Sequence, residues 1–286
     1  MEILRTWAKI PVRVEACEPS AWQDPRLIQT YSPRAAVYVL PAADFGVFTV
    51  GRLPRDPQAR QVLEDLAEEV CRALHGREVR GMTLPGRGVC ATGRIAVRWT
   101  TSALYVREHE RPPIDPEDAR IELCRRHVHA FGPTTPAAFA WWAGVSLPDA
   151  RKSFGLIADE LVPVDLAGHE AWVLAADEPA VRSAEPVRGV RLLPAPDLRL
   201  FGQDRTQLFA GPGQNGQPPL QDWFHPHGLV VDGRIVGAWG RRGGQVNIKA
   251  AGPLPPSARH AIHAEAASMP IPDRKITVSL TEHRTE

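Results

Sequence analysis

Apolar residues recur every three or four positions in five stretches of the chain, and this spacing predicts amphipathic helices. The helix ends carry the expected signals. Asp56 and Asp115 each precede a proline at the first helical position, and Gly76 and Gly132 follow the last apolar residue. The predicted helices cover residues 56–75, 115–131, 135–143, 146–161 and 257–268.

Short runs rich in β-branched and aromatic residues predict strands between and after these helices. The dipeptide Asp232-Gly233 separates two such runs and predicts a hairpin, because these residues accept the positive φ of a type I′ turn. Near the end of the chain, polar and apolar residues alternate as they do in half-buried strands. The predicted strands cover residues 37–40, 47–50, 94–100, 103–107, 161–164, 171–174, 229–231, 235–239, 245–249 and 275–280.

The middle of the chain has the order helix, helix, three-residue turn, helix, hairpin, which is typical of a helix-turn-helix with a wing. We predict that an apolar stripe on the third helix faces the other two helices. Arg151, Lys152 and Ser153 would then lie on the outward face that is offered to DNA. The alternative is that this unit packs against its neighbours and binds no nucleic acid. The predicted stripe consists of Leu147, Ala150, Phe154, Ile157 and Leu161.

Linkers rich in proline and acidic residues divide the chain into three parts, an N-terminal α+β part, a winged helix-turn-helix and a C-terminal β-barrel-like domain with one added helix. Residues 1–113 hold 16 Lys and Arg against 13 Asp and Glu. Residues 114–180 hold 5 against 11, and residues 181–286 hold 13 against 9. The middle part is therefore acidic, and acidic side chains near a phosphate backbone oppose DNA binding.

The overall composition is that of an ordinary folded protein, with 43% hydrophobic and 23% charged residues. Its 34 Lys and Arg nearly balance 33 Asp and Glu, so net charge alone identifies no partner. The four cysteines form no CxxC motif and no disulfide framework, which favours a reduced compartment. No stretch reads as a signal peptide or a membrane helix, so we expect a cytoplasmic protein without a membrane partner.

Several segments resemble the bacterial winged-helix DNA-binding family that includes the AlkZ/YcaQ-type DNA glycosylases. They include Phe131-Gly132-Pro133-Thr134 and the later Trp141-Trp142-Ala143-Gly144. The resemblance spans residues 27–240, and it implies tandem winged-helix units with a C-terminal β-barrel around a DNA-binding cleft. The segments that carry it are residues 27–34, 37–41, 130–136, 140–144, 159–162, 192–197, 202–205 and 230–237.

In characterised glycosylases of this family, a Gln-x-Gln or Gln-x-Asp motif in the first winged helix is needed to excise alkylated or cross-linked bases. Neither motif occurs in this sequence. Gln23, Gln203 and Gln221 are each followed directly by Asp, without the intervening residue that the motif requires. The chain also begins where the first winged helix of the family would end. We therefore expect the segment that carries the motif to be missing.

Other candidate residues lie outside the middle part. Asp197 ends a predicted strand beside Arg199 and Arg205, so it is a candidate catalytic group, with a structural ion pair as the alternative. We predict no metal site at His225 and His227, because no further pair of ligands stands at a recognisable spacing, and no organic cofactor. The predicted DNA-binding residues are Arg34, Arg151, Lys152, Ser153, Arg188, Arg191, Arg199 and Arg205.

Three functional hypotheses follow. The sequence favours a winged-helix DNA-binding protein without catalytic activity. The first alternative is a DNA-repair glycosylase of the AlkZ/YcaQ type that acts on alkylated or cross-linked bases. The second alternative is a protein-binding scaffold, which would suit the acidic middle part.

Overall fold

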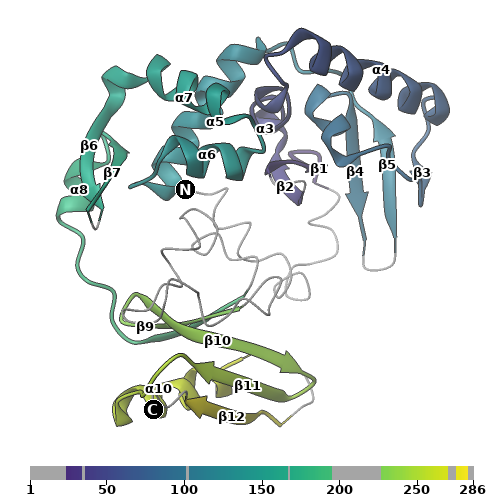
Figure 1. Ribbon diagram of the computed structural model, residues 1–286. Coiled ribbons are helices and arrows are strands. Elements are labelled where there is room, and N and C mark those ends of the chain that lie inside the picture. Colours follow the sequence, from purple (N-terminus) through teal and green to yellow (C-terminus); the bar gives the residue numbers. More distant parts are fainter. Residues whose placement is uncertain are drawn as a thin grey trace. The chain divides into compact units, whose positions relative to one another are not determined.

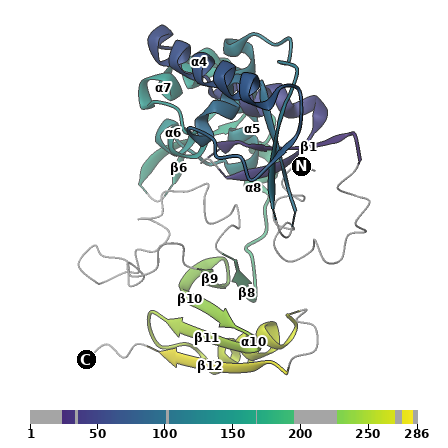
Figure 2. The same cartoon turned by 90° about the vertical axis from the view of Figure 1, so that its right-hand side faces the viewer.

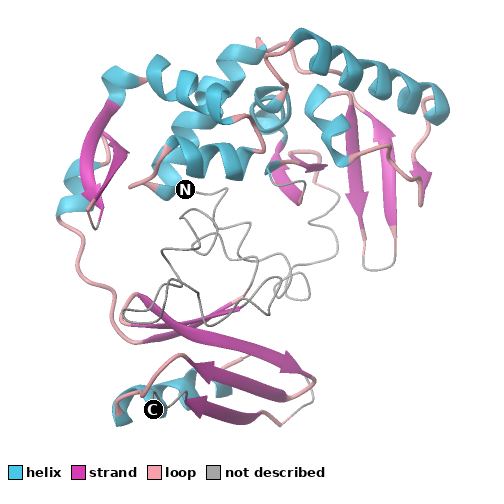
Figure 3. Ribbon diagram, in the orientation of Figure 1, coloured by secondary structure: helices cyan, strands magenta, loops and turns pink. Residues whose placement is uncertain are grey.

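The computed structural model describes residues 24–33, 36–100, 103–166, 168–194, 227–269 and 275–282. Over these ranges the chain mixes helices with several sheets (Figures 1 and 3), which confirms the α+β class. Its contacts divide it into two compact units, Met1–Pro179 and Ala180–Glu286. Apart from residue 180, the first two of the three predicted parts thus lie in one unit.

The first unit contains a five-stranded antiparallel sheet with the strand order β2-β1-β4-β5-β3. The predicted helix after Asp56 packs on one face of this sheet, where Val70 and Leu74 meet Ile95 and Val97 in a buried core. The Asp56 carboxylate accepts a hydrogen bond of 2.7 Å from the Ala59 N–H, as expected of an N-cap. The elements are β1 (Leu27–Tyr31), β2 (Val37–Pro41), α4 (Pro57–Leu74), β3 (Val79–Arg80), β4 (Ile95–Trp99) and β5 (Leu104–Glu108).

One predicted strand of this unit is wrong. Residues 47–50 belong to the short helix α3 (Phe45–Thr49) and the 3₁₀ turn η5 (Val50–Arg52) that follows it. All five residues of α3 are buried, so its sequence shows neither a polar face nor an alternation. A short run that is apolar throughout does not distinguish a buried helix from a buried strand, because both lack a solvent-facing side.

The predicted order of elements in the middle of the chain is confirmed. Helix α5 (Pro116–Phe131) leads into α6 (Pro136–Ala143), a tight turn, α7 (Leu147–Leu156) and a hairpin of β6 (Leu161–Leu166) and β7 (His169–Leu174). Helix α7 ends five residues earlier than predicted. A 3₁₀ turn, η7 (Ala158–Glu160), intervenes before the hairpin, so Leu161 begins β6 instead of ending the helix.

The second unit contains a mixed sheet with the strand order β12-β11-β10-β9-β8. Its core lies between the sheet and helix α10, where Leu229, Val246 and Ile248 pack with Ile262 (Figure 2). The hairpin predicted at Asp232-Gly233 is present, with φ of 48° and 78° at these residues. The elements are β8 (Val190–Leu193), β9 (His227–Val231), β10 (Arg234–Arg242), β11 (Gln245–Ala250), α10 (Pro256–Ala267) and β12 (Thr277–Glu282). The short helix α8 (Glu178–Arg182) lies at the junction of the two units.

The predicted β-barrel is wrong for the part of this unit that the structure describes. Strands β8 and β12 are edge strands there, so the sheet does not close. Strands β11 and β12 run parallel, and α10 connects them. This helix covers the apolar face that a barrel would have enclosed, so closure of the sheet is not needed to bury it.

The described cysteines Cys71, Cys90 and Cys124 are free and buried thiols. Burial raises the pKa of Cys90 to about 11 and that of Cys124 to about 12. These thiols therefore stay protonated at neutral pH and are poor nucleophiles. None of the described helices has both the length and the hydrophobicity needed to span a membrane.

Candidate nucleic-acid interface

The turn between α6 and α7 is held by local capping. The Thr135 hydroxyl accepts from the Ala138 N–H at 3.1 Å and begins α6, and the Ser146 hydroxyl accepts from the Asp149 N–H at 3.1 Å and begins α7. Gly144 ends α6 with a φ of +70°, a left-handed conformation that favours glycine. The end of α6, the turn and the start of α7 are thus fixed by residues close to them in the sequence.

A buried histidine lies at the centre of the helical unit. His127 of α5 is fully buried among the rings of Phe131, Phe139 and Trp142, at centroid distances of 5.0 to 5.3 Å. Its Nε2 lies 3.0 Å from the Thr134 hydroxyl. Burial lowers the pKa of His127 to about 3, so the ring is neutral at pH 7 and serves as a core residue.

The segment between α5 and α6 also pairs with the hairpin. Thr134 forms an isolated antiparallel bridge with Trp172 of β7, with hydrogen bonds of 3.0 and 2.8 Å between their backbones. Thr134 therefore connects the buried histidine to the strand pair β6 and β7. The three helices and the hairpin form one continuous packed structure.

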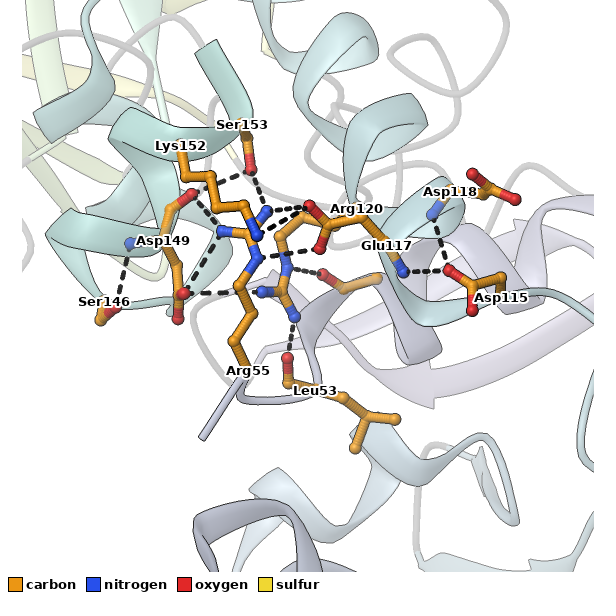
Figure 4. Close-up of polar contacts among 11 residues, drawn as sticks. Leu53, Arg55, Asp115, Glu117, Asp118, Arg120, Ser146, Asp149, Lys152 and Ser153 are labelled. Carbon is orange, nitrogen blue, oxygen red and sulfur yellow. Dashed lines mark hydrogen bonds and ion pairs between the residues drawn. The ribbon is translucent and has the colours of Figure 1, made fainter. Parts of the chain in front are cut away.

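A cluster of polar side chains fixes α7 to α5 and to the segment before α4 (Figure 4). The Arg55 guanidinium donates to both carboxylate oxygens of Glu117 at 2.8 and 2.6 Å. Its other terminal nitrogen donates to the backbone oxygen of Asp149 at 2.7 Å, and the terminal nitrogen that bonds to Glu117 also donates to the hydroxyl of Ser153 at 3.4 Å. The bonds from Arg55 lower the pKa of Glu117, which keeps this carboxylate charged.

Arg120 of α5 lies beneath this cluster and is 1% exposed. Its Nε donates to the Gly51 carbonyl at 3.0 Å, and one terminal nitrogen donates to the Leu53 carbonyl. Its other terminal nitrogen is 3.9 Å from the Asp149 carboxylate. Arg120 thus holds the backbone that precedes α4 against the first turns of α5 and α7.

Arg52 plays a similar part at the end of α6. Its Nε donates to the Ala143 carbonyl at 2.7 Å, which satisfies one of the last free carbonyls of the helix. Burial lowers the pKa of Arg52 to about 10, which still leaves it charged at pH 7. A positive charge at a helix C-terminus is favourable because the helix dipole is negative there.

The structure separates the three residues predicted on the outward face of α7. Arg151 and Lys152 are exposed, and only Lys152 has an ionic neighbour in the described chain, with Nζ 3.8 Å from Glu117. The prediction for Ser153 is wrong, because its hydroxyl is buried and donates to the Asp149 carbonyl at 3.0 Å. The prediction that Leu147 lies in the buried stripe is also wrong, since it is 37% exposed.

The partly exposed arginines of α5 are already paired with carboxylates. Arg125 contacts the carboxylates of Glu122 and Glu160, each at 2.6 Å. Arg126 contacts Glu122 at 2.7 Å and Asp44 at 2.6 Å. Arg151 and Lys152 are therefore the cations of α5 to α7 that remain available to a phosphate backbone.

The remaining predicted residues fall in two groups. Arg188 and Arg191 are exposed in the second unit, and Arg191 donates to the carbonyl of Val190 at 2.6 Å. Arg34, Asp197, Arg199 and Arg205 lie outside the described residues. Within the described residues, no group of three or more His, Cys, Asp or Glu side chains could hold a metal ion.

Three arginines that fix the helices, Arg52, Arg55 and Arg120, were not predicted from the sequence. A signal existed for Arg120, because it precedes Cys124 by four residues and therefore shares the buried face of α5. Arg52 ends the 3₁₀ turn η5 and Arg55 lies in the irregular segment before α4, and neither segment is long enough for a periodicity to indicate which side chains are buried.

The chain is similar to DNA glycosylases. The sequence model of the family described as "DNA glycosylase AlkZ-like" matches residues 73–270. An "Interstrand DNA cross-link repair glycosylase" of Streptomyces sahachiroi is 32% identical over 130 residues. These residues are 44% of this chain and 35% of that relative, so the match spans about a third of the relative's length.

The fold gives a second similarity. The solved structure of "Streptomyces sahachiroi DNA glycosylase AlkZ" matches with a TM-score of 0.69 at 20% sequence identity, over 91% of this chain and 83% of that chain. This match shows a shared fold, and the resemblance expected from the sequence is confirmed. Because the family model covers well over half of the chain, the protein belongs to the AlkZ-like DNA glycosylase family.

Proposed function

We propose that the protein is a DNA-repair glycosylase that acts on alkylated or cross-linked bases. The observation that carries this proposal is the match of the family model to residues 73–270, which include the whole helical unit from α5 to the hairpin of β6 and β7. The similarity to a cross-link repair glycosylase supports the same activity. The comparisons thus favour this alternative over the non-catalytic protein that the sequence analysis preferred. A repair role would place the protein in the bacterial cytoplasm with its DNA partner.

The helical unit would bind duplex DNA as a winged helix, with α7 as the helix offered to the major groove. Two observations support this assignment: the tight turn between α6 and α7, and the bridge between Thr134 and Trp172 that joins the helices to the hairpin. Arg151 and Lys152 would neutralise phosphates, while Arg55 and Arg120 hold the helix in position.

Removal of a damaged base breaks the bond between its nitrogen and the deoxyribose carbon, with water adding to that carbon. The sugar becomes oxocarbenium-like, so the site must hold a water molecule and accept an extruded nucleotide. We assign no catalytic residue among the described side chains, and Asp197 stays a prediction. The sequence contains no Gln-x-Gln or Gln-x-Asp motif. This observation favours the second candidate function, a DNA-binding protein without catalytic activity.

One experiment separates these functions. The purified chain is incubated with duplexes that carry an alkylated purine or an interstrand cross-link, and abasic sites are detected by strand cleavage in alkali. Formation of abasic sites supports the glycosylase, provided that undamaged duplex stays intact. Binding without base release would contradict the glycosylase and support the non-catalytic protein. Absence of binding even at low salt would contradict both and favour a protein-binding scaffold.

A further inference from the structure

Strand β4 ends in an exposed tryptophan, and we propose that Trp99 stacks on a nucleobase that has left the helical stack of damaged or distorted DNA. This inference deepens the proposed function and rests on it, because a repair glycosylase needs access to an unstacked nucleotide. The occupant is therefore a base in DNA, and a protein partner is an outcome that the test can reveal.

The position of Trp99 follows from the alternation along β4. Ile95 and Val97 point toward α4 and are buried in the core of the first unit. Trp99 follows them at the same two-residue spacing and lies on the same face, but it is 59% exposed. The end of the hairpin that carries Trp99 lies away from α4 in Figure 1. Its ring lies beyond the cover of the helix, and no ring contact or hydrogen bond of its indole is found within the described chain.

The backbone beneath this ring is held rigidly. The Trp99 N–H donates to the side-chain oxygen of Gln29 at 2.6 Å, and Gln29 is 8% exposed. Trp99 pairs with Leu104 across the hairpin, and the next N–H, of Thr100, donates to the Ala103 carbonyl at 2.9 Å. A buried glutamine thus holds the backbone of an exposed aromatic residue. A ring on a fixed backbone loses little conformational entropy when a ligand stacks on it.

The opposite face of the hairpin carries a positive charge that suits a nucleic acid. Arg98 lies over the Tyr105 ring, at 4.1 Å from its centroid, and bonds to Glu78 at 3.0 Å. Arg80 pairs with Tyr105 in the register of β3 and β5, and Arg107 lies two residues further along β5. Both are exposed, and no ion pair of either is found with the described residues. Three arginines against one glutamate give this face a net charge of +2 for phosphate contact.

An unstacked base suits this site better than intact duplex does. In an intact duplex both faces of each base are covered by neighbouring bases, so a tryptophan at a hairpin end has no π-face to contact. A base that is unpaired, or that neighbours an extruded nucleotide, exposes one face, and stacking on an aromatic side chain is independent of base identity. The proposal thus predicts a preference for distorted DNA without a preference for sequence.

The test compares three full-length variants with the wild type on two labelled duplexes of the same sequence, one intact and one with a single unpaired base. Trp99→Ala should lower affinity for the distorted duplex about tenfold, which corresponds to about 1.4 kcal/mol, and should change affinity for the intact duplex by less than about twofold. Trp99→Phe retains a stacking ring and should retain most of the preference. Val62→Ala removes an apolar side chain of similar exposure, 57%, from α4 and serves as the matched control, with no change expected on either duplex.

Intrinsic fluorescence supplies an independent reading, because stacking of a base on the indole quenches its emission. The distorted duplex should quench the wild type more than it quenches Trp99→Phe. The inference is overturned if Trp99→Ala loses the same affinity for both duplexes or loses none for either. Trp99 would then contact a protein partner or be exposed without any binding role. If the wild type binds neither duplex at low salt, the proposed function itself fails. Binding of both duplexes without an effect at Trp99 contradicts only this inference.

Discussion

Helix α7 has two sets of cations on its two sides, and they have opposite roles. Arg55 and Arg120 lie on the inner side, where they donate hydrogen bonds to a carboxylate and to backbone carbonyls. Arg151 and Lys152 lie on the outer side, exposed to water. The inner set can stabilise only the protein, because Arg120 is buried and most donors of the two arginines are already engaged. The outer set contributes little to stability and stays available to an anionic partner.

The largest expected effect is on the inner side. Arg120→Met keeps the length of the side chain but leaves the buried carbonyls of Gly51 and Leu53 without their donor. We expect the free energy of unfolding to fall by about 3 kcal/mol, because these were charge-assisted hydrogen bonds in a buried site. Denaturant unfolding measures the loss, and Arg151→Met is the matched control on the outer side. If Arg120→Met and Arg151→Met have the same free energy of unfolding, the inner cations do not stabilise the protein more than the outer ones.

The second prediction concerns the buried ring beneath the same helices. The folded pKa of His127 is lowered to about 3, whereas an unfolded histidine titrates near pH 6.5. Between these values the unfolded chain binds the proton and the folded chain does not. The contribution of the neutral ring to the free energy of unfolding is therefore fully present above about pH 6.5. It is lost as the pH falls, and the free energy of unfolding decreases by about 2 kcal/mol between pH 7 and pH 5.

Chemical denaturation of the wild type and of His127→Phe at both pH values measures this effect. The phenylalanine variant loses the contact with Thr134 but should show a smaller pH dependence, because its ring takes up no proton. If the free energy of unfolding changes equally between the two pH values in both proteins, His127 becomes protonated in the folded state. That result would contradict its role as a neutral core residue.

The third prediction tests the outer side. The double substitution Arg151→Ala and Lys152→Ala should weaken binding to duplex DNA about tenfold at low salt, whatever the base sequence. It should also lower the slope of log affinity against log salt by about 2, one for each lost phosphate contact. A titration over a salt series measures both quantities. The double substitution Arg125→Ala and Glu160→Ala is the control, since it removes an ion pair whose charges cancel. If the slope of log affinity against log salt is the same as in the wild type, α7 does not belong to the proposed interface.

The smallest expected effect concerns Ser153, which adjoins Lys152 in the sequence but lies on the inner side. Ser153→Ala removes a buried hydroxyl that donates to Asp149 and accepts from Arg55. We expect a loss of stability of about 0.5–1 kcal/mol and no change in the salt slope of DNA binding. Loss of DNA affinity without loss of stability would restore the sequence-based prediction that Ser153 contacts DNA.

The local features of the fold could be predicted because their causes lie within a few residues. Asp56, Asp115 and Ser146 each accept a hydrogen bond from an N–H two or three residues later, so the starts of three helices were visible in the sequence. Asp232 and Gly233 adopt positive φ for a reason that is equally local. The same holds for Gly144, which ends α6.

Features that depend on distant neighbours were predicted less well. Residues 45–49 form a helix that is buried on all sides, and only the packing around them decides between helix and strand. The sheet of the second unit stays open in the described part, because α10 covers its apolar face. Strand patterns alone do not state whether a sheet or a helix will provide that cover.

The sequence by itself determined the α+β class, the order of elements from α5 to β7, the main helix boundaries and the membership of the AlkZ-like family. These follow from short-range capping, from periodicity and from motifs that are read along the chain. Only the tertiary structure decided which arginines face inward, that Ser153 is buried and that Trp99 extends beyond its core. The physical reason is that burial depends on atoms far away in the sequence: Arg55 finds its partners 62 and 94 residues later.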